Sequence, residues 1–159
     1  MHGAAMIELT LADEQATARL GAATAQRLRS GEAVCLYGPL GAGKSTLARA
    51  LIRALTRPDE EVPSPTFTLV QTYPARDFEI AHFDLYRLTS AGEVDELGLD
   101  EALETGVAII EWPQRLEGRL PADRLDIHLE LLAEAGDGRR ARLEGFGSWS
   151  GRERELVDG

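Results

Sequence analysis

The residues that could do chemistry gather first around one lysine. The chain of 159 residues contains sixteen arginines and a single lysine, Lys44. Lys44 stands in the segment GPLGAGKS, residues 38–45, which satisfies the phosphate-binding pattern G-x-x-x-x-G-K-[ST]. The compact lysine ammonium can reach between the β- and γ-phosphates of a nucleotide, whereas a planar guanidinium has the wrong shape. The lysine therefore marks a predicted phosphate site.

The segments on either side of this loop support the prediction. Residues 33–37, AVCLY, form a short apolar run that is typical of a buried strand, and residues 46–55 combine strong helix formers with apolar side chains at helical spacing. A loop between a strand and a helix offers a phosphate the free N–H groups and the positive dipole end of the helix. Ser45 would give its hydroxyl to Mg²⁺. A glycine-rich turn without a ligand is the alternative interpretation.

Phosphate loops work together with an acidic residue at the end of another strand. Four apolar residues, 107–110, precede Glu111, where the usual acid is aspartate. We expect Glu111 to bind Mg²⁺ directly or through water, because carboxylate oxygen is a ligand that this ion prefers. A surface glutamate that merely ends a strand is the alternative.

A proline-bearing segment, VPSPTF at residues 62–67, forms a second candidate element. Pro63 and Pro65 fix the backbone, and Thr66 could offer its hydroxyl to Mg²⁺ or to a γ-phosphate oxygen. The alternative is a plain proline-rich entry to a strand.

A third candidate element is HFDLYR, residues 82–87. Strand alternation places the polar residues His82, Asp84 and Tyr86 on one face, where burial without partners would be costly. Asp84 could position an attacking water or bind the metal through water. The alternative is an edge strand with one solvated face.

Charge and composition restrict the class of protein. The net charge of −10 and the pI of about 4.8 argue against a chain that itself grips a nucleic-acid backbone, and they permit docking onto a basic protein. Cys35 is the only cysteine, so an internal disulfide is excluded. Residues 1–12 show no signal peptide and no stretch is apolar enough to span a membrane, so we expect a cytoplasmic protein.

The pattern of elements predicts one domain over residues 1–159. The predicted fold is an α/β, P-loop NTPase-like three-layer sandwich around a mixed sheet, with the phosphate site at the carboxyl ends of the central strands. Antiparallel pairs are expected within 67–86 and 125–146, and the tail after about 147 is expected to form a short helix or to be loose. Strands are predicted at 6–9, 33–37, 66–73, 78–86, 107–110, 125–132 and 140–146. Helices are predicted from an N-cap at Thr10 to Leu28, at 46–55, and at 90–104 with a break near Gly98.

Four blocks in this order resemble the TsaE family, also called YjeE. The blocks are residues 38–47, 63–69, 82–87 and 110–113, and the resemblance covers roughly residues 8–146. It implies a small ATPase that binds ATP and ADP with Mg²⁺ and hydrolyses ATP slowly when alone. It also implies docking on a TsaD–TsaB protein complex that makes threonylcarbamoyladenosine in tRNA, so that tRNA is met only indirectly through the complex and no membrane is involved.

The resemblance also assigns roles to individual residues. It implies that Ser45 and Glu111 hold Mg²⁺, and that Thr66 and Asp84 act with Lys44 in the switch and catalytic blocks. Residues near the start of the first helix would contact adenine, which points to Thr10 or Glu14. The expected nucleotide contacts are Gly38, Leu40, Gly41, Ala42, Gly43, Lys44, Ser45 and Thr46.

Three other functions remain to be weighed. A small-molecule kinase uses the same loop with an arginine-bearing lid, but Pro113 and Pro121 leave little room for a mobile helix. A GTPase of the usual kind needs a second lysine in an N-K-x-D motif, and this chain has none. A nucleotide-dependent binding module without turnover would share every feature of the site. The candidate lid residues are Arg115, Arg119 and Arg124.

Overall fold

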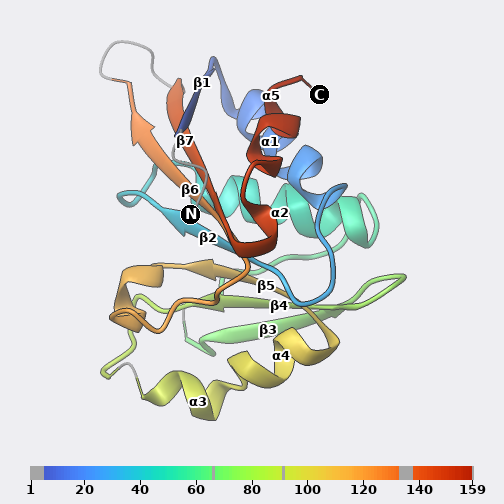
Figure 1. Cartoon of the computed structure of the whole chain (residues 1–159), viewed down its shortest axis with the longest axis vertical. Helices are drawn as coiled ribbons and strands as arrows, with labels where there is room; N and C mark the ends of the chain where they lie inside the picture. The colour runs from blue at the N-terminus through green and yellow to red at the C-terminus, as the bar shows by residue number, and fades with distance from the viewer. Residues whose placement is uncertain (1–5, 66, 91, 133–137, 159) are drawn as a thin grey trace.

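The strands form one mixed sheet (Figure 1). The computed structural model describes residues 6–65, 67–90, 92–132 and 138–158, and in these residues seven strands are ordered β1-β7-β6-β2-β5-β4-β3. The strands are β1 Ile7–Leu11, β2 Ala33–Tyr37, β3 Val70–Pro74, β4 Glu79–Asp84, β5 Gly106–Glu111, β6 Arg124–Leu131 and β7 Arg139–Phe146. The α-helices are α1 Glu14–Ala25, α2 Lys44–Leu55, α3 Glu93–Leu97, α4 Leu99–Thr105 and α5 Glu155–Asp158; short 3₁₀ turns are η1 Pro113–Leu116, η2 Gly147–Trp149 and η3 Arg152–Arg154.

The centre of the sheet is parallel and its two sides are antiparallel. Strands β6, β2, β5 and β4 run in the same direction, β3 returns along β4, and β7 returns along β6. Both predicted hairpins and the mixed sheet are thereby confirmed. Since β2, β5 and β4 are parallel, their carboxyl ends meet at one edge, where Asp84 lies opposite Glu111 in register.

Side-chain alternation on the buried strands separates two cores and gives three layers. On β5, Val107 and Ile109 face α1 and α2, whereas Ala108 and Ile110 face α3 and α4. All four side chains are fully buried. The continuous apolar run of this strand is explained by helices on both faces, as Figure 1 also shows. The predicted three-layer α/β sandwich is confirmed.

The start of the first helix was predicted wrongly. Strand β1 continues through Leu11, with Thr10 opposite Arg140 of β7, so Thr10 is not a helix cap. The cap is Asp13, whose carboxylate accepts a hydrogen bond of 2.8 Å from the Ala16 backbone N–H. Pairing with β7 extends the strand past the residue whose type suggested a cap. The helix also ends at Ala25, before the predicted Leu28.

The strand predicted over residues 66–73 is shorter than expected. Residues 67–69 form a turn, and Leu69 has a positive φ of 69°, a left-handed conformation that interrupts a strand. The Leu69 N–H donates to Pro65 O at 2.7 Å, and its carbonyl accepts from the Asp84 N–H at 3.0 Å. The alternative of a solvated edge strand for residues 82–87 is also wrong, because β4 lies between β3 and β5 and buries both His82 and Asp84.

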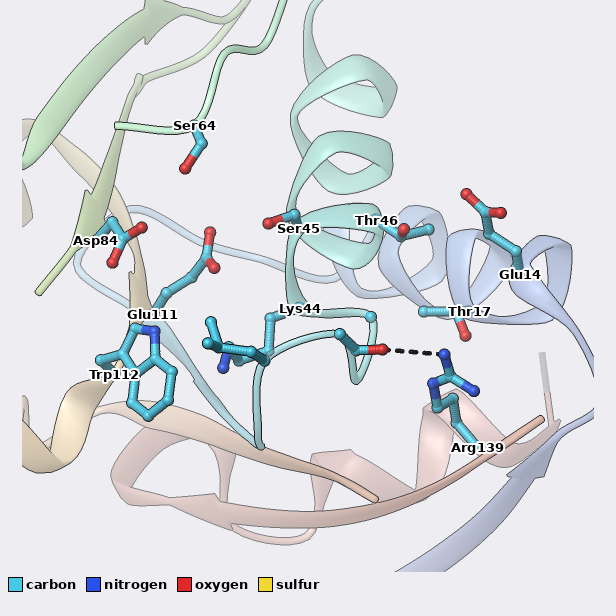
Figure 2. Close-up of a pocket in the computed structure, with 13 residues that line it drawn as sticks. Glu14, Thr17, Lys44, Ser45, Thr46, Ser64, Asp84, Glu111, Trp112 and Arg139 are labelled. Atoms are coloured by element: carbon cyan, nitrogen blue, oxygen red, sulfur yellow. Dashed lines mark hydrogen bonds between the residues drawn. The ribbon is translucent and has the colours of Figure 1, made fainter. Parts of the chain in front are cut away.

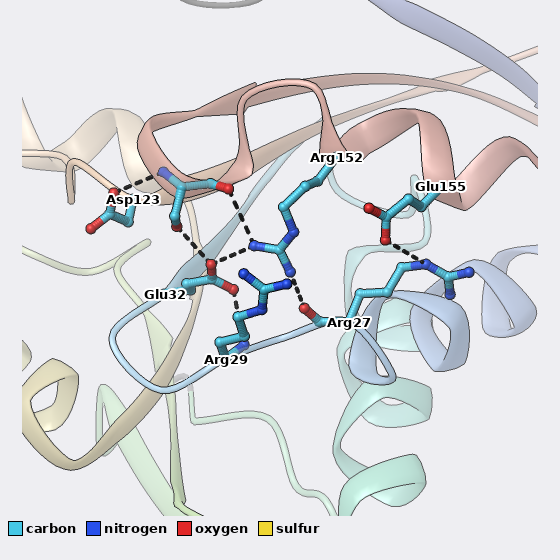
Figure 3. Close-up of polar contacts among 7 residues, drawn as sticks. Arg27, Arg29, Glu32, Asp123, Arg152 and Glu155 are labelled. Carbon is cyan, nitrogen blue, oxygen red and sulfur yellow. Dashed lines mark hydrogen bonds and ion pairs between the residues drawn. The ribbon is translucent and has the colours of Figure 1, made fainter.

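The segment after residue 147 is packed against the body of the protein. Trp149 is fully buried and joins the core beside α1 and α2, together with Leu156 of α5. The Arg152 guanidinium pairs with Glu32 at 2.6 Å (Figure 3). Of the two alternatives for this tail, the ordered short helix is the one observed. Within the described residues, no helix has the length and apolar character that a membrane span requires.

Candidate functional site

A cavity opens where the carboxyl ends of the central strands meet the start of α2. Its volume is about 340 Å³, and Figure 2 shows the side chains that line it. This is the position that the phosphate-loop motif predicted. The lining residues are Glu14, Thr17, Leu40, Gly41, Gly43, Lys44, Ser45, Thr46, Ser64, Asp84, Glu111, Trp112 and Arg139.

Three glycines give the loop before α2 its shape. Gly38, Gly41 and Gly43 have φ angles of 149°, 82° and 105°, which side chains of L-residues rarely adopt. A Cβ at Gly38 would also lie 2.7 Å from the carbonyl oxygen of Leu129. Of the predicted phosphate contacts, Gly38 and the buried Ala42 support the loop from behind, whereas the others face the cavity.

Lys44 lies at the base of the cavity and is 5% exposed. Its Nζ donates hydrogen bonds to the carbonyls of Gly38 and Pro39, and it lies 3.8 Å from the centre of the Trp112 ring. Burial lowers the pKa of Lys44 from its usual value, and the negative charges of Glu111 and Asp84 oppose this shift. The ammonium is thus directed along the loop with an indole face beside it.

Oxygen-bearing side chains gather at one end of the cavity. Ser45, Ser64, Asp84 and Glu111 face the same space in Figure 2. The Asp84 carboxylate accepts the Tyr86 backbone N–H at 3.1 Å, which holds it at the end of β4. Hydroxyl and carboxylate oxygens are the hard donors that Mg²⁺ prefers, so the donor set fits this ion. The structure brings together the predicted metal ligands and Asp84.

The opposite end of the cavity is formed by α1, the start of α2 and one arginine of β7. Glu14, Thr17 and Thr46 line it, and Figure 2 shows Arg139 beside them. Of the two residues predicted to contact adenine, Glu14 lines the cavity; Thr10 does not, since it lies exposed in β1.

Some residues of the site were not predicted from the sequence. Arg139 donates to Ala42 O at 3.1 Å and to Gly41 O at 3.0 Å, and no local pattern links it to the loop. Trp112 follows Glu111 directly, so its position after a strand-end acid was an available signal. Thr17 lies one turn after the cap of α1. Thr66 lies outside the described residues, and its predicted role stays a prediction.

The arginines considered as a kinase lid have other partners. The Arg119 guanidinium lies 3.2 Å from Asp95, and that of Arg124 lies 3.0 Å from Asp126. Arg115 lies over the ring of Tyr86. None of the three lines the cavity.

Comparisons with known proteins match most of the chain to one family. Residues 11–141 match the family described as "Threonylcarbamoyl adenosine biosynthesis protein TsaE". Proteins named "tRNA threonylcarbamoyladenosine biosynthesis protein TsaE" are similar to the chain. The one from Rickettsia felis is 40% identical over 126 residues, 79% of this chain and 74% of that protein. The one from Aquifex aeolicus is 37% identical over 137 residues, 86% of this chain and 94% of that protein.

The fold has a similar counterpart among solved structures. The crystal structure of Bacillus subtilis YdiB matches with a TM-score of 0.78 and 26% identity, covering 97% of this chain and 95% of that one. The family match spans the glycine loop, Asp84 and Glu111, and therefore the elements that surround the cavity. The chain belongs to the TsaE family.

Proposed function

We propose that the chain is a Mg²⁺-dependent ATPase that serves tRNA threonylcarbamoyladenosine biosynthesis by acting on a TsaD–TsaB complex. The observation that carries the proposal is the meeting of Lys44, Ser45, Asp84 and Glu111 around one cavity. The similar proteins are named for this biosynthesis. The net charge of −10 favours contact with tRNA only through the partner complex.

Each residue has a role that follows from its place. Lys44 and the N–H groups of the loop would bind the phosphates. Ser45 and Glu111 would hold Mg²⁺, which would neutralise charge on the phosphate oxygens. Asp84 accepts a hydrogen bond from the attacking water and orients it. Glu14 and Thr46 line the other end of the cavity, where the nucleoside would lie.

The proposal is tested by measuring Mg²⁺-ATP turnover of the purified protein with and without the TsaD–TsaB complex of its host. Slow turnover that rises when the complex is added supports a partner-coupled ATPase. Turnover that ignores the complex, with no co-purification, would reject the role in tRNA modification. Conversion of a metabolite to a phosphorylated product would instead support the small-molecule kinase.

Lys44→Ala is the control for the nucleotide site. A charge-assisted contact to phosphate contributes about 1.5–3 kcal/mol, so we expect ATP affinity or turnover to fall at least roughly tenfold. Titration calorimetry and a phosphate-release assay measure the two quantities. Unchanged affinity and unchanged turnover would contradict the phosphate-loop assignment.

Asp84→Ala separates an ATPase from a binding module without turnover. We expect this variant to retain nucleotide binding and to lose turnover, because Asp84 acts on the attacking water and not on the phosphates. The same two assays measure this. Turnover equal to that of the wild type would remove Asp84 from the mechanism.

A further inference from the structure

The carboxylate of Glu111 is held by an imidazole that does not line the cavity. His82 Nε2 lies 2.7 Å from Glu111 Oε2, and the two residues are 2% and 3% exposed. In the described part of the chain, His82 is the only side chain that hydrogen-bonds to Glu111. This hydrogen bond therefore helps to orient the carboxylate.

The register of β4 and β5 explains how the two residues meet. His82 lies opposite Ile109, so Glu111 is two residues further along the neighbouring parallel strand. Both side chains are on the face that carries α1 and α2, from which α2 presents Ser45. The long side chain of glutamate can contact both His82 and the cavity. An aspartate, shorter by one methylene, would reach less far from the same backbone position.

The surroundings of the imidazole determine which nitrogen donates. His82 Nδ1 is buried and has no hydrogen-bond partner among the described residues. A proton on Nδ1 would be a buried donor without an acceptor, and it would leave the Nε2 lone pair facing the carboxylate oxygen of Glu111. The tautomer with its proton on Nε2 satisfies the contact, so Nε2–H donates to Glu111 Oε2.

We propose that His82 is a positioning residue for the metal site. By donating to Oε2, it fixes the side chain of Glu111 so that Oε1 faces the space shared with Ser45. The inference rests on the proposed function, because it requires Mg²⁺ at Ser45 and Glu111. Residues that hydrogen-bond a metal ligand typically change metal affinity by about 10–100-fold when they are removed.

Two amide substitutions form a matched pair that tests this role. In His82→Gln, the side-chain NH₂ group can occupy the position of Nε2 and donate to Glu111. In His82→Asn, the amide is shorter, lies near the position of Nδ1 and cannot reach the carboxylate. Both replacements are polar and uncharged, so the pair differs mainly in the contact with Glu111.

The measurement is ADP affinity by titration calorimetry over a series of Mg²⁺ concentrations and in EDTA. For His82→Asn we expect a roughly tenfold rise in the Mg²⁺ concentration that gives half of the maximal change in ADP affinity. ADP affinity in EDTA should stay close to that of the wild type. For His82→Gln we expect both quantities to stay within about twofold of the wild type. A purely structural role would lower the affinity in EDTA as well.

Glu111→Gln provides a second test that does not depend on the His82 variants alone. If His82 acts through Glu111, adding His82→Asn to Glu111→Gln leaves the already weakened Mg²⁺ dependence unchanged. Urea unfolding of each variant shows whether it is folded. Where His82→Asn does not fold, the weakened Mg²⁺ dependence expected for Glu111→Gln is the result that is tested.

The outcomes distinguish this inference from the proposed function. Wild-type ADP binding that ignores Mg²⁺ would reject both. A wild type that responds to Mg²⁺ and a folded His82→Asn variant with the same response would reject the positioning role alone. Equal losses of ADP affinity in EDTA and in Mg²⁺ for His82→Asn would also reject the positioning role. A Mg²⁺ response of Glu111→Gln equal to that of the wild type would reject it as well.

Discussion

The charged side chains of the site are nearly buried and compensate each other. Lys44, Asp84 and Glu111 are 5%, 6% and 3% exposed. Burial lowers the pKa of Lys44, and the two carboxylates oppose this shift. On the proposed function, nucleotide phosphates would add negative charge beside the lysine, and Mg²⁺ would add positive charge beside the carboxylates. Binding of the two together should therefore be stronger than the sum of each alone.

His128 should make the stability of the protein depend on pH. Its ring stacks on Tyr37 with 4.3 Å between the ring centres, and burial lowers its pKa below 6.5, with the charge of Arg142 acting in the same direction. Glu144 and Glu130 oppose this shift. The unfolded chain then binds a proton where the folded chain does not. The free energy of unfolding should therefore decrease as the pH falls below 6.5 and be unaffected by this group well above it.

His128→Phe keeps an aromatic ring on Tyr37 and removes the titration. We expect the loss of unfolding free energy between about pH 7.5 and about pH 5.5 to be smaller in this variant than in the wild type. Urea unfolding at the two pH values measures this. Equal losses in the two proteins would show that His128 does not contribute.

Local motifs predicted those cavity residues that stand within a recognisable stretch of sequence. Lys44 and Ser45 follow from the glycine loop, and Glu111 from the apolar residues before it. The contact between His82 and Glu111 could not be predicted in the same way, because it depends on the register of two strands. Arg139 and Ala42 are 97 residues apart, and only the folded sheet brings them together.

At the scale of elements, contacts between distant segments fixed some ends of strands and helices that the local sequence did not predict. Thr10 has the residue type of a helix cap, yet its pairing with β7 keeps it in a strand. Leu69 belongs to an alternating apolar pattern, but it adopts a left-handed backbone conformation. Its backbone hydrogen-bonds to Pro65 and to Asp84. The order of elements, the hairpins and the mixed sheet were predicted because hydrophobic periodicity and turn residues are local signals.

The phosphate loop is also held by an element outside the strand and helix that flank it. Arg139 of β7 donates from its guanidinium to the carbonyls of Ala42 and Gly41. For Arg139→Ala we expect ADP affinity to fall roughly fivefold, about 1 kcal/mol, because the hydrogen bonds are charge-assisted but partly exposed. Calorimetry with ADP measures this change.

Arg140→Ala is the matched control for Arg139. Arg140 is exposed and is the next residue along β7, and its substitution removes the same charge. We expect ADP affinity in this variant to stay within about twofold of the wild type, as for most surface changes. Equal losses in the two variants would indicate a general charge effect and not support of the loop.

At the scale of the whole molecule, the C-terminal segment joins the start of the central strand to α1. Arg152 pairs with Glu32, which also accepts hydrogen bonds from Ser148 Oγ and from the Arg29 backbone N–H (Figure 3). Glu32 is 3% exposed and directly precedes β2. Because β2 leads into the phosphate loop, the segment supports the base of the strand that carries the site.

Trp149 should be the largest single contribution of this segment to stability. Its side chain is fully buried in the core, with an exposed fraction of 0%. Replacing a buried tryptophan by alanine removes apolar contacts and leaves a cavity, so we expect Trp149→Ala to lower the free energy of unfolding by about 3–5 kcal/mol. Urea unfolding measures this, and Val157→Ala, at a residue 46% exposed in α5, is the control with an expected change below about 0.5 kcal/mol.

The same variant separates stability from binding. Trp149 does not line the cavity, so the folded fraction of Trp149→Ala should bind ADP with the affinity of the wild type. Calorimetry below the onset of unfolding tests this. A decrease in the free energy of unfolding of less than about 1 kcal/mol would show that the body of the protein is stable without the tryptophan. A loss of ADP affinity in the folded variant would instead show that the packing of Trp149 in the core affects the conformation of the phosphate loop.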